Sequence, residues 1–277
     1  MTSNTLRSDQ LRVLAIANQK GGVGKTTTTI NLGTALAAVG EKVLILDIDS
    51  QGNASTGVGV AHGTRNLSTY NVLTGAASLL QGAQRTQVPN LFIVPATKDL
   101  VGFEAEHLED RNRAFRLRDA INGLHGIQQA MVSEKPFTYV LIDCPPSLSL
   151  LTLNALVAAN AVVVPVQCEF YALEGISQLN ETIEDIRATL NPRLEIQGVV
   201  LTMHDSRTAL SHEVAQEVRN FFGSKVYQTV IPRNVRVAEA PSYGKPILLY
   251  DYNCPGSRAY VSLASEMINR ERSAKAA

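Results

Sequence analysis

Short apolar runs rich in Val, Ile and Leu alternate with segments of helical periodicity along the whole chain. This alternation is typical of βαβ units around a mostly parallel sheet whose two faces are both buried. The pattern therefore predicts an α/β protein with a doubly wound, mostly parallel sheet and helices on both faces. The expected strands are residues 12–18, 42–47, 91–95, 139–143, 161–166, 196–202 and 226–231. The expected helices include residues 28–39, 172–190, 211–222 and 257–272.

The chain shows no internal boundary. Its composition does not shift along its length, and no linker rich in Pro, Gly or Ser divides it. With 277 residues, 45% of them hydrophobic, it is long enough to bury a large core. We therefore expect a single domain over residues 11–272, with a flexible segment before it (1–10) and a flexible tail after it (273–277).

A glycine-rich stretch separates the first expected strand from the first expected helix. A strand, a turn of small residues and a helix N-terminus surround an anion with backbone N–H groups, which is the phosphate cradle of a P-loop. The motif assigns Lys25 to the β- and γ-phosphates of a nucleotide and the Thr26 hydroxyl to Mg²⁺. The spacing fits the deviant Walker A form, which carries an additional lysine, Lys20. The residues of the stretch are Lys20, Gly21, Gly22, Val23, Gly24, Lys25, Thr26 and Thr27.

Two other apolar strands lead into carboxylates. Asp47 and Asp49 stand two residues apart, so their side chains project to the same side at the carboxyl edge of the sheet. Asp143 ends another strand, as does the Walker B aspartate that binds Mg²⁺ opposite the P-loop threonine. Hydrolysis also requires a group that orients the attacking water. Asp49 is the candidate for that task, and Asp47 for a structural role.

Bulk composition narrows the choice of functions. The formal net charge is +0 and the pI about 7.0, so contact with nucleic acid would require a local basic patch. Cys144, Cys168 and Cys254 are odd in number and lack C-x-x-C spacing, which argues against a disulfide framework, a zinc site or an iron–sulfur cluster. The N-terminus is polar and no apolar run is long enough to span a membrane, so we expect a cytoplasmic protein.

Five motifs in a fixed order resemble those of the ParA/Soj-type chromosome- and plasmid-partitioning ATPases. The resemblance extends from about Leu11 to Ala264. One departure is visible, because Ser50 stands where this family usually has proline, which leaves a free N–H donor and a looser turn beside Asp49. This departure bears on the rate of hydrolysis rather than on nucleotide binding. The motifs are residues 16–27, 47–53, 143–147, 165–169 and 231–236.

The resemblance implies a slow, Mg²⁺-dependent ATPase whose ATP form is a sandwich dimer. In such a homodimer Lys20 would cross the interface to the partner's nucleotide, and Asp49 would be poised on the attacking water. Pro232 and Asn234 match positions that surround the adenine base. Glu169 matches a position from which a side chain reaches toward the partner's nucleotide.

The resemblance also implies macromolecular partners. Dimerisation would create a surface for nonspecific double-stranded DNA, so the protein would associate with the nucleoid. A ParB-type protein bound at a centromere-like site would stimulate hydrolysis and release the dimer. Arg207 and Arg236 match positions that the family uses for DNA, and further candidates for the same surface are Arg233, Lys245 and Arg258.

Two other functions stay open. A MinD-like ATPase would position a membrane or protein-cluster cargo, with its last helix lying on lipid. In this chain that helix carries an apolar stripe of Val261, Ala264, Met267 and Ile268, which is more typical of a core-facing side. A metabolic P-loop enzyme, such as an amidoligase or a nitrogenase-reductase relative, would need a small-molecule pocket or bridging cysteines, and no dedicated sequence for either is visible.

Overall fold

The computed structural model describes residues 11–130, 135–169 and 172–276. The predicted flexible segment 1–10 lies outside the described residues, as does Ala277. The other residues of the predicted tail form the end of the last helix.

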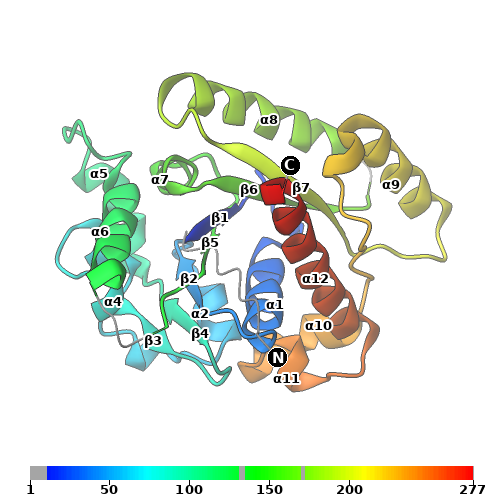
Figure 1. Ribbon diagram of the computed structural model, residues 1–277, viewed down its shortest axis with the longest axis horizontal. Helices are drawn as coiled ribbons and strands as arrows, with labels where there is room; N and C mark the ends of the chain where they lie inside the picture. Colours follow the sequence, from blue (N-terminus) through cyan, green and yellow to red (C-terminus); the bar gives the residue numbers. More distant parts are fainter. Residues whose placement is uncertain (1–10, 131–134, 170–171, 277) are drawn as a thin grey trace.

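Within these residues seven strands form one sheet, in the order β3-β4-β2-β5-β1-β6-β7 (Figure 1). Neighbouring strands pair in parallel except β3 and β4, which confirms the predicted doubly wound, mostly parallel α/β fold. The chain leaves β1 toward β2 on one side and later reaches β6 and β7 on the other, which creates a switch point at β1. The strands are β1 (Arg12–Ile16), β2 (Val43–Asp47), β3 (Gln84–Arg85), β4 (Leu91–Val94), β5 (Tyr139–Asp143), β6 (Ala161–Gln167) and β7 (Glu195–Thr202).

Helices cover both faces of the sheet. The helices at residues 25–38, 172–189, 209–222 and 255–276 confirm the four predicted ones, whereas those at 116–130 and 150–158 were not predicted. Several short helices occupy the loops between strands. The helices are α1 (Lys25–Ala38), α2 (Asn53–Gly57), α3 (Thr69–Leu73), α4 (Leu79–Gly82), α5 (Phe103–Glu106), α6 (Arg116–Ala130), α7 (Leu150–Ala158), α8 (Ala172–Thr189), α9 (Ala209–Phe222), α10 (Val235–Glu239), α11 (Ile247–Tyr250) and α12 (Pro255–Ala276). The 3₁₀ turns are η1 (His62–Thr64), η2 (Lys98–Val101), η3 (Gly223–Lys225) and η4 (Ala240–Tyr243).

The sheet separates two hydrophobic cores. Because successive side chains of a strand point to opposite faces, Leu14 and Ile16 of β1 enter one core while Val13 and Ala15 enter the other. Helices α1 and α12 lie side by side over the first core, and α6, α7, α8 and α9 cover the second (Figure 1). Burial on both faces is why the strands are continuously apolar.

Six of the seven predicted strands are confirmed, and the seventh, residues 226–231, is wrong. That segment bonds to β7 only near its two ends. Between them, the N–H groups of Gln228 and Thr229 donate to the carboxylate of Glu266 on α12, at 2.8 and 2.9 Å. An acidic side chain thus takes donors that a strand ladder would use. The remaining strand of the sheet is β3, whose two residues are too few to give an apolar pattern.

The apolar side of α12 faces the protein interior. Ala264 and Met267 of the predicted stripe are buried together with Tyr260, whereas Val261 and Ile268 lie half-buried at its margin. The stripe is therefore part of the core, as its pattern predicts. In the part of the chain that the structure describes, no helix combines the length and apolar character needed to cross a bilayer.

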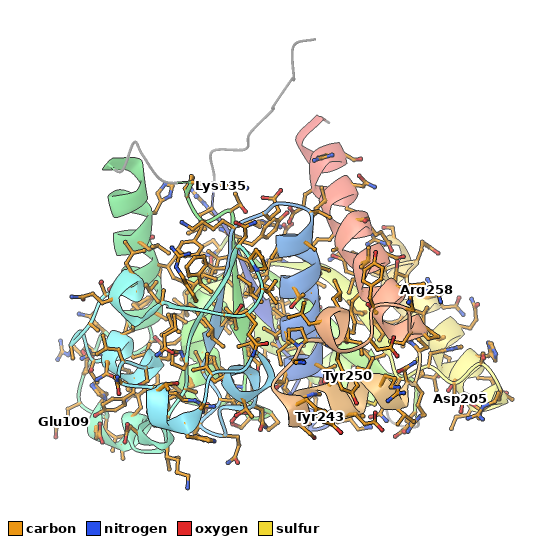
Figure 2. The ribbon with its side chains drawn as sticks, turned by 90° about the horizontal axis from the view of Figure 1, so that it is seen from below. Glu109, Lys135, Asp205, Tyr243, Tyr250 and Arg258 are labelled. Atoms are coloured by element: carbon orange, nitrogen blue, oxygen red, sulfur yellow. The ribbon has the colours of Figure 1, made fainter. Side chains whose placement is uncertain are left out.

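The carboxyl ends of the central strands meet at one edge of the sheet. Ile16 of β1 is in register with Asp143 of β5, which is in turn in register with Asp47 of β2. Asp205, just beyond β7, lies at this end of the molecule, and Lys135, before β5, lies at the opposite end (Figure 2). The edge with the aspartates is where ligands bind in open α/β sheets.

Gly198 of β7 leaves room for the fully buried ring of Tyr227. A Cβ at residue 198 would lie 2.4 Å from Tyr227 Cε2 and 3.0 Å from the carbonyl oxygen of Lys225. We expect Gly198→Ala to lower the free energy of unfolding by about 1–3 kcal/mol, because this part of the core is already filled. Denaturant unfolding measures the change. Gly123→Ala in α6, which would meet no atom within 4 Å, is the control and should keep or gain stability; equal losses in both variants would contradict the prediction.

Candidate nucleotide-binding site

The glycine-rich stretch forms a tight loop between β1 and α1. Gly22 and Gly24 have φ angles of 75° and 90°, in the left-handed region that glycine adopts without steric cost. Val23 between them is buried, and its carbonyl oxygen accepts a hydrogen bond from the Thr202 hydroxyl at 2.8 Å. The end of β7 therefore fixes the loop from one side.

Asn18 fixes the start of the same loop. Its side-chain amide donates to the carbonyl oxygen of Pro165 at 2.8 Å, and its side-chain oxygen accepts from the N–H of Lys20 at 3.0 Å. Sequence reasoning assigned no role to Asn18 or to Thr202. The available signal was a polar residue at the end of an apolar strand, in both cases at the edge where the site forms.

The loop has the donors of an anion site. Within the described residues, the backbone N–H groups of residues 21–27 donate to no internal acceptor, as is usual at a helix N-terminus that binds phosphate. The Lys25 ammonium donates to the carbonyl oxygen of Lys20 at 2.9 Å. Burial lowers the pKa of Lys25, and the neighbouring Asp143 opposes this shift. A buried ammonium beside free N–H groups is well placed for a phosphate.

Asp143 lies fully buried beside the first turn of α1. The Thr29 hydroxyl donates to Asp143 Oδ1 at 3.0 Å, and Oδ2 has no hydrogen-bond partner among the described residues. Burial raises the pKa of Asp143 to about 8; the charge of Asp47 adds to the rise, and the nearby hydroxyls of Thr26 and Thr29 oppose it. Thr29 was not predicted, although the run of threonines at 26–29 places a second hydroxyl one helical turn after Thr26.

Thr26 and Asp143 together fit Mg²⁺. This ion binds to proteins through one or two oxygen ligands and takes its other ligands from water and phosphate. A buried carboxylate oxygen without a partner, beside a threonine hydroxyl, is such a ligand set. The described residues contain no group of three or more His, Cys, Asp or Glu side chains that could bind a metal alone. An ion at this position would therefore depend on the phosphates as well.

Asp47, unlike Asp143, is saturated with hydrogen bonds. Its Oδ2 accepts from the N–H and the hydroxyl of Ser55 at 2.8 and 2.6 Å, and its Oδ1 accepts from the N–H of Asp49 at 3.3 Å. Burial raises the pKa of Asp47 to about 6, and the bonds from Ser55 oppose the rise. These contacts tie the end of β2 to α2, and the structural role of Asp47 stays a prediction.

Asp49 begins a tight turn after β2. Its Oδ1 accepts from the N–H of Gln51 at 3.0 Å, and its carbonyl oxygen accepts from the N–H of Gly52 at 2.8 Å. Gly52 closes the turn with a φ of 64°. The turn thus forms with Ser50 in it, without a proline. Burial lowers the pKa of Lys25, and the charge of Asp49 is among those that oppose this shift, so the Asp49 carboxylate lies near the Lys25 ammonium.

The residues predicted to surround the base lie beside the end of β7. The N–H of Arg233 donates to the carbonyl oxygen of His204 at 2.9 Å, which brings Pro232 next to that strand end. Asn234 caps α10 with its side-chain oxygen. Arg233 Nη2 also forms an ion pair with Glu169 Oε1 at 2.9 Å. A predicted DNA-binding residue is therefore joined to a predicted nucleotide-binding residue.

Arg207 and Arg233 share one neighbourhood. The Arg207 side chain has an exposed fraction of 84% and donates two hydrogen bonds to the Asp205 carboxylate, at 2.9 and 2.7 Å. Both arginines depress the pKa of Asp205, with Arg207 as the main cause. The two candidate DNA-binding residues nearest β7 are thus both paired with carboxylates.

Arg236 lies farther along, on α10. It forms ion pairs with Glu239 at 3.2 Å and Asp251 at 3.6 Å, so its charge is offset as well. The arginines at 207, 233 and 236 therefore each present a neutralised charge rather than an open basic patch. The two other candidates, Lys245 and Arg258, are both exposed. Figure 2 labels Arg258.

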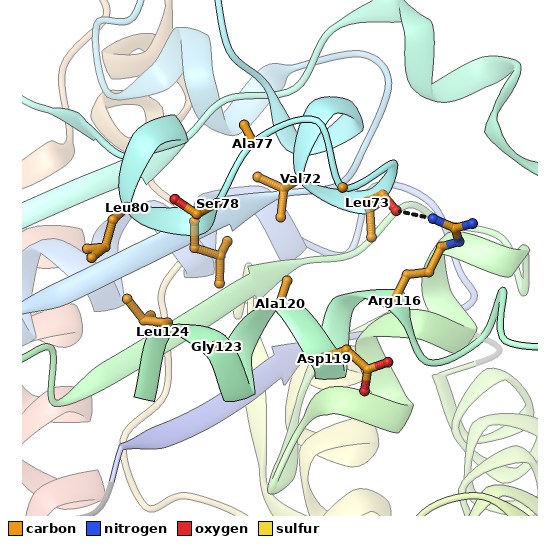
Figure 3. A pocket seen from close by; sticks show the side chains of 12 residues that line it. Val72, Leu73, Ala77, Ser78, Leu80, Arg116, Asp119, Ala120, Gly123 and Leu124 are labelled. Carbon is orange, nitrogen blue, oxygen red and sulfur yellow. Dashed lines mark hydrogen bonds between the residues drawn. The ribbon is translucent and has the colours of Figure 1, made fainter. Parts of the chain in front are cut away.

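A hollow of about 340 Å³ lies elsewhere, between α3, α4 and α6 (Figure 3). Apolar side chains such as Val72 and Leu124 line it, and Arg116 donates to the carbonyl oxygen of Leu73 at 3.0 Å at one end. None of the predicted site residues belongs to its lining. The hollow is therefore separate from the nucleotide loop.

The fold and the loop define the class of protein. In this mostly parallel sheet, β1 leads through a deviant Walker A loop into α1, and the adjacent strand β5 ends in an aspartate. These features define a P-loop nucleotide-binding protein. A family model described as an AAA domain matches residues 11–196.

Curated relatives identify the family. The chain is 59% identical over 271 residues to the chromosome partitioning protein ParA of Caulobacter vibrioides, covering 98% of this chain and 99% of the relative. It is 48% identical over 256 residues to the sporulation initiation inhibitor protein Soj of Bacillus subtilis, covering 92% and 98%. The chain belongs to the ParA/Soj family of chromosome-partitioning ATPases, as its five motifs predicted.

Solved structures agree on the fold. Cobyrinic acid a,c-diamide synthase of Mycobacterium smegmatis, with bound ADP and magnesium, is 35% identical with a TM-score of 0.81, covering 96% of this chain and 97% of that one. The cell division ATPase MinD of Pyrococcus furiosus is 27% identical with a TM-score of 0.74, covering 93% and 98%. Sequence identity is higher to the partitioning proteins than to either of these.

The raised pKa of Asp143 gives a test of the buried site. As pH rises from about 4 to 8, the unfolded carboxyl loses its proton first, so without nucleotide and metal this residue costs the native state increasing stability. We expect Asp143→Asn to stabilise the protein, with a larger gain at about pH 8 than at about pH 5. Urea unfolding in EDTA at both pH values measures the difference. Asp119→Asn on the surface is the control, and a gain for Asp143→Asn that does not grow with pH would refute the argument.

Proposed function

We propose that this ATPase works as an ATP-dependent sandwich dimer, binds double-stranded DNA nonspecifically in that state, and drives chromosome or plasmid segregation with a ParB-type partner that stimulates hydrolysis. The observation that carries the proposal is that the loop bearing Lys20 adjoins Asp49 and Asp143 at one edge of the sheet. In the proposed dimer, the Lys20 side chain of a second copy would reach a nucleotide bound there by the first.

Each residue of the site has a task in this proposal. The N–H groups of residues 21–27 and the Lys25 ammonium bind the phosphates of ATP, and Thr26 and Asp143 bind Mg²⁺. The ion would offset the negative charge that develops on the phosphates during transfer. Asp49 orients the water for in-line attack. The ADP and magnesium in the structure of the synthase relative support these two ligands.

The base end of the site involves an ion pair. Pro232 and Asn234 would flank adenine, and Glu169 would reach toward the partner's nucleotide. Glu169 is bonded to Arg233, so this reach requires the ion pair to open. Exposed pairs contribute only about 0–1 kcal/mol, and opening therefore costs little.

The proposed DNA binding also depends on the low cost of opening exposed ion pairs. Phosphates of DNA can compete for arginines whose ion pairs are exposed, and each contact adds a modest, salt-dependent gain. Arg207, Arg236, Arg233 and Lys245 give one chain few such contacts. Two copies joined by ATP double the number and raise avidity far above that of one chain. ATP thereby controls association with the nucleoid.

Burial of the apolar side of α12 favours partitioning over the MinD-like alternative. A helix that lies on lipid must offer its apolar side to the membrane. In this structure the apolar side of α12 is already buried, because Tyr260 and Met267 pack in the core. The relatives named for chromosome partitioning, at 45–59% identity, support the same choice.

Asp49→Ala tests the hydrolytic part of the proposal. Removing the carboxylate that orients water should lower ATP turnover by about 100-fold or more and trap the ATP dimer on DNA. Phosphate release and light scattering measure turnover and dimerisation.

Lys20→Ala should instead prevent ATP-dependent dimerisation while ATP still binds. Wild-type turnover in Asp49→Ala, or an unchanged ATP dimer in Lys20→Ala, would assign the residue concerned to another role.

The double variant Arg207→Ala, Arg236→Ala tests the DNA surface. With ATP, its affinity for duplex DNA should fall, and the slope of log affinity against log salt should decrease by about 1 for each lost phosphate contact. Gel shifts with ATP, with ADP and without nucleotide at two salt concentrations provide the measurement. Arg187→Ala is the control, because Arg187 forms a similar exposed ion pair with Glu184 on α8. Unchanged affinity in the double variant would exclude these residues from the DNA surface.

A further inference from the structure

Arg65 is a buried arginine that the nucleotide motifs do not include. Its exposed fraction is 6%, and it follows the 3₁₀ turn η1. The guanidinium donates to the carbonyl oxygen of Val60 at 3.0 Å, to that of Ala96 at 3.1 Å and to the Thr56 hydroxyl at 2.8 Å. Within the described residues it has no carboxylate at ion-pair distance. A buried cation satisfied by neutral oxygens is costly to fold, so its position calls for a reason.

The Arg65 guanidinium reaches the turn that carries Asp49. The Thr56 hydroxyl, which accepts from Arg65, donates to the carbonyl oxygen of Gly52 at 3.1 Å. The N–H of Gly52 in turn donates to the carbonyl oxygen of Asp49 at 2.8 Å. Hydrogen bonds through Thr56 and the backbone of Gly52 therefore connect the buried arginine with the residue proposed to orient water.

The guanidinium also packs directly against the turn. A Cβ on Gly52 would lie 2.3 Å from Arg65 Nη1 and 3.3 Å from the carbonyl oxygen of Ala96. Gly52 has a φ of 64°, so both its backbone angle and its surroundings require glycine. Arg65 thus fills the space behind the turn that Asp49 begins.

Helix α2 holds this turn at both ends. Ser55 binds the Asp47 carboxylate before the turn, and Thr56 binds the Gly52 carbonyl oxygen after it. The Ser55 hydroxyl also accepts from the N–H of Ala96, the residue whose carbonyl oxygen binds Arg65. Arg65 therefore contacts both residues that hold the turn: it bonds Thr56 directly, and it is linked to Ser55 through the backbone of Ala96.

We propose that Arg65 is a positioning residue for hydrolysis, which acts through Thr56 and Gly52 to hold the Asp49 turn in place. This inference rests on the proposed role of Asp49. Proline at position 50 would stiffen the turn covalently, and this chain has Ser50 there, so the hydrogen-bonded brace supplies constraint that the backbone lacks. Small displacements of a reacting group reduce rates strongly, and a brace of this kind acts on turnover rather than on binding.

Thr56→Val tests the brace with little change in shape. It removes the hydroxyl that joins Arg65 to Gly52 and leaves the bonds of Arg65 to Val60 and Ala96. We expect kcat for ATP hydrolysis to fall by about 10-fold to 100-fold, while ATP affinity stays at the wild-type value. Because buried Arg65 loses one acceptor, Tm should fall, and kcat is therefore measured well below Tm. Thr56→Ser restores the hydroxyl and should restore kcat.

Thr74→Val is the matched control. The Thr74 hydroxyl also bonds the carbonyl oxygen four residues earlier, that of Tyr70, at 3.0 Å, and it lies at the end of α3 away from the turn. This variant should keep wild-type kcat. If Thr56→Val and Thr74→Val have the same kcat, or if Thr56→Val lowers kcat only in proportion to a loss of folded protein, the brace plays no part in turnover.

A double-mutant cycle with Arg65→Lys tests whether the two residues act as one unit. Lysine keeps the charge but has its donors on one nitrogen, in place of the planar guanidinium whose separate nitrogens bond Thr56 and the two carbonyl oxygens. The effects of Arg65→Lys and Thr56→Val on kcat should be far from additive, whereas additive effects would overturn the proposal. Asp49→Ala in the same assay distinguishes the proposed function from the proposed brace. If Asp49→Ala does not reduce turnover, the hydrolytic role assigned to Asp49 in the proposed function is refuted. Loss of turnover in Asp49→Ala, with wild-type turnover in Thr56→Val, refutes the brace alone.

Discussion

Two carboxylates buried side by side at the carboxyl edge of the sheet determine the surrounding architecture. Asp47 and Asp143 are in register on adjacent strands, and both have an exposed fraction of 0%. Burial and the proximity of like charges raise the pKa of both groups, so this edge requires donors and cations around it. The Lys25 ammonium from the loop and the Arg65 guanidinium from behind α2 supply positive charge on either side.

The two carboxylates differ in how completely their oxygens are satisfied, and this difference separates their tasks. Ser55 and the backbone of the following turn saturate Asp47, which makes it a fixed joint between β2 and α2. Thr29 binds only one oxygen of Asp143, and the other oxygen stays available for an ion. Identical residues at equivalent strand ends thus acquire different chemistry from the helices that pack against them.

Sequence patterns predict the parts of this molecule in which the signal is local. The six confirmed strands are buried on both faces, so an apolar run reports their burial directly, and the nucleotide loop is one continuous motif. The segment 226–231 has the same apolar character, but Glu266 on a distant helix takes its N–H groups. Thr29, Asn18 and Arg65 were missed for a related reason, because each has a hydrogen-bond partner far away in the sequence. These partners are Asp143, Pro165 and Ala96, respectively.

The charged surface shows the same contrast and bears on the proposed cycle. The pairing of Arg207 with Asp205 spans two residues and can be anticipated from sequence, whereas Glu169 and Arg233 are 64 residues apart. Both pairs are accessible to solvent, so each carboxylate offsets the charge of its arginine but can be displaced at little cost in free energy. Unpaired arginines would hold DNA in every nucleotide state, and buried pairs would never yield to a phosphate. In the proposed cycle, exposed pairs would give a single chain weak affinity for DNA, and the main gain in affinity would come from the joining of two copies.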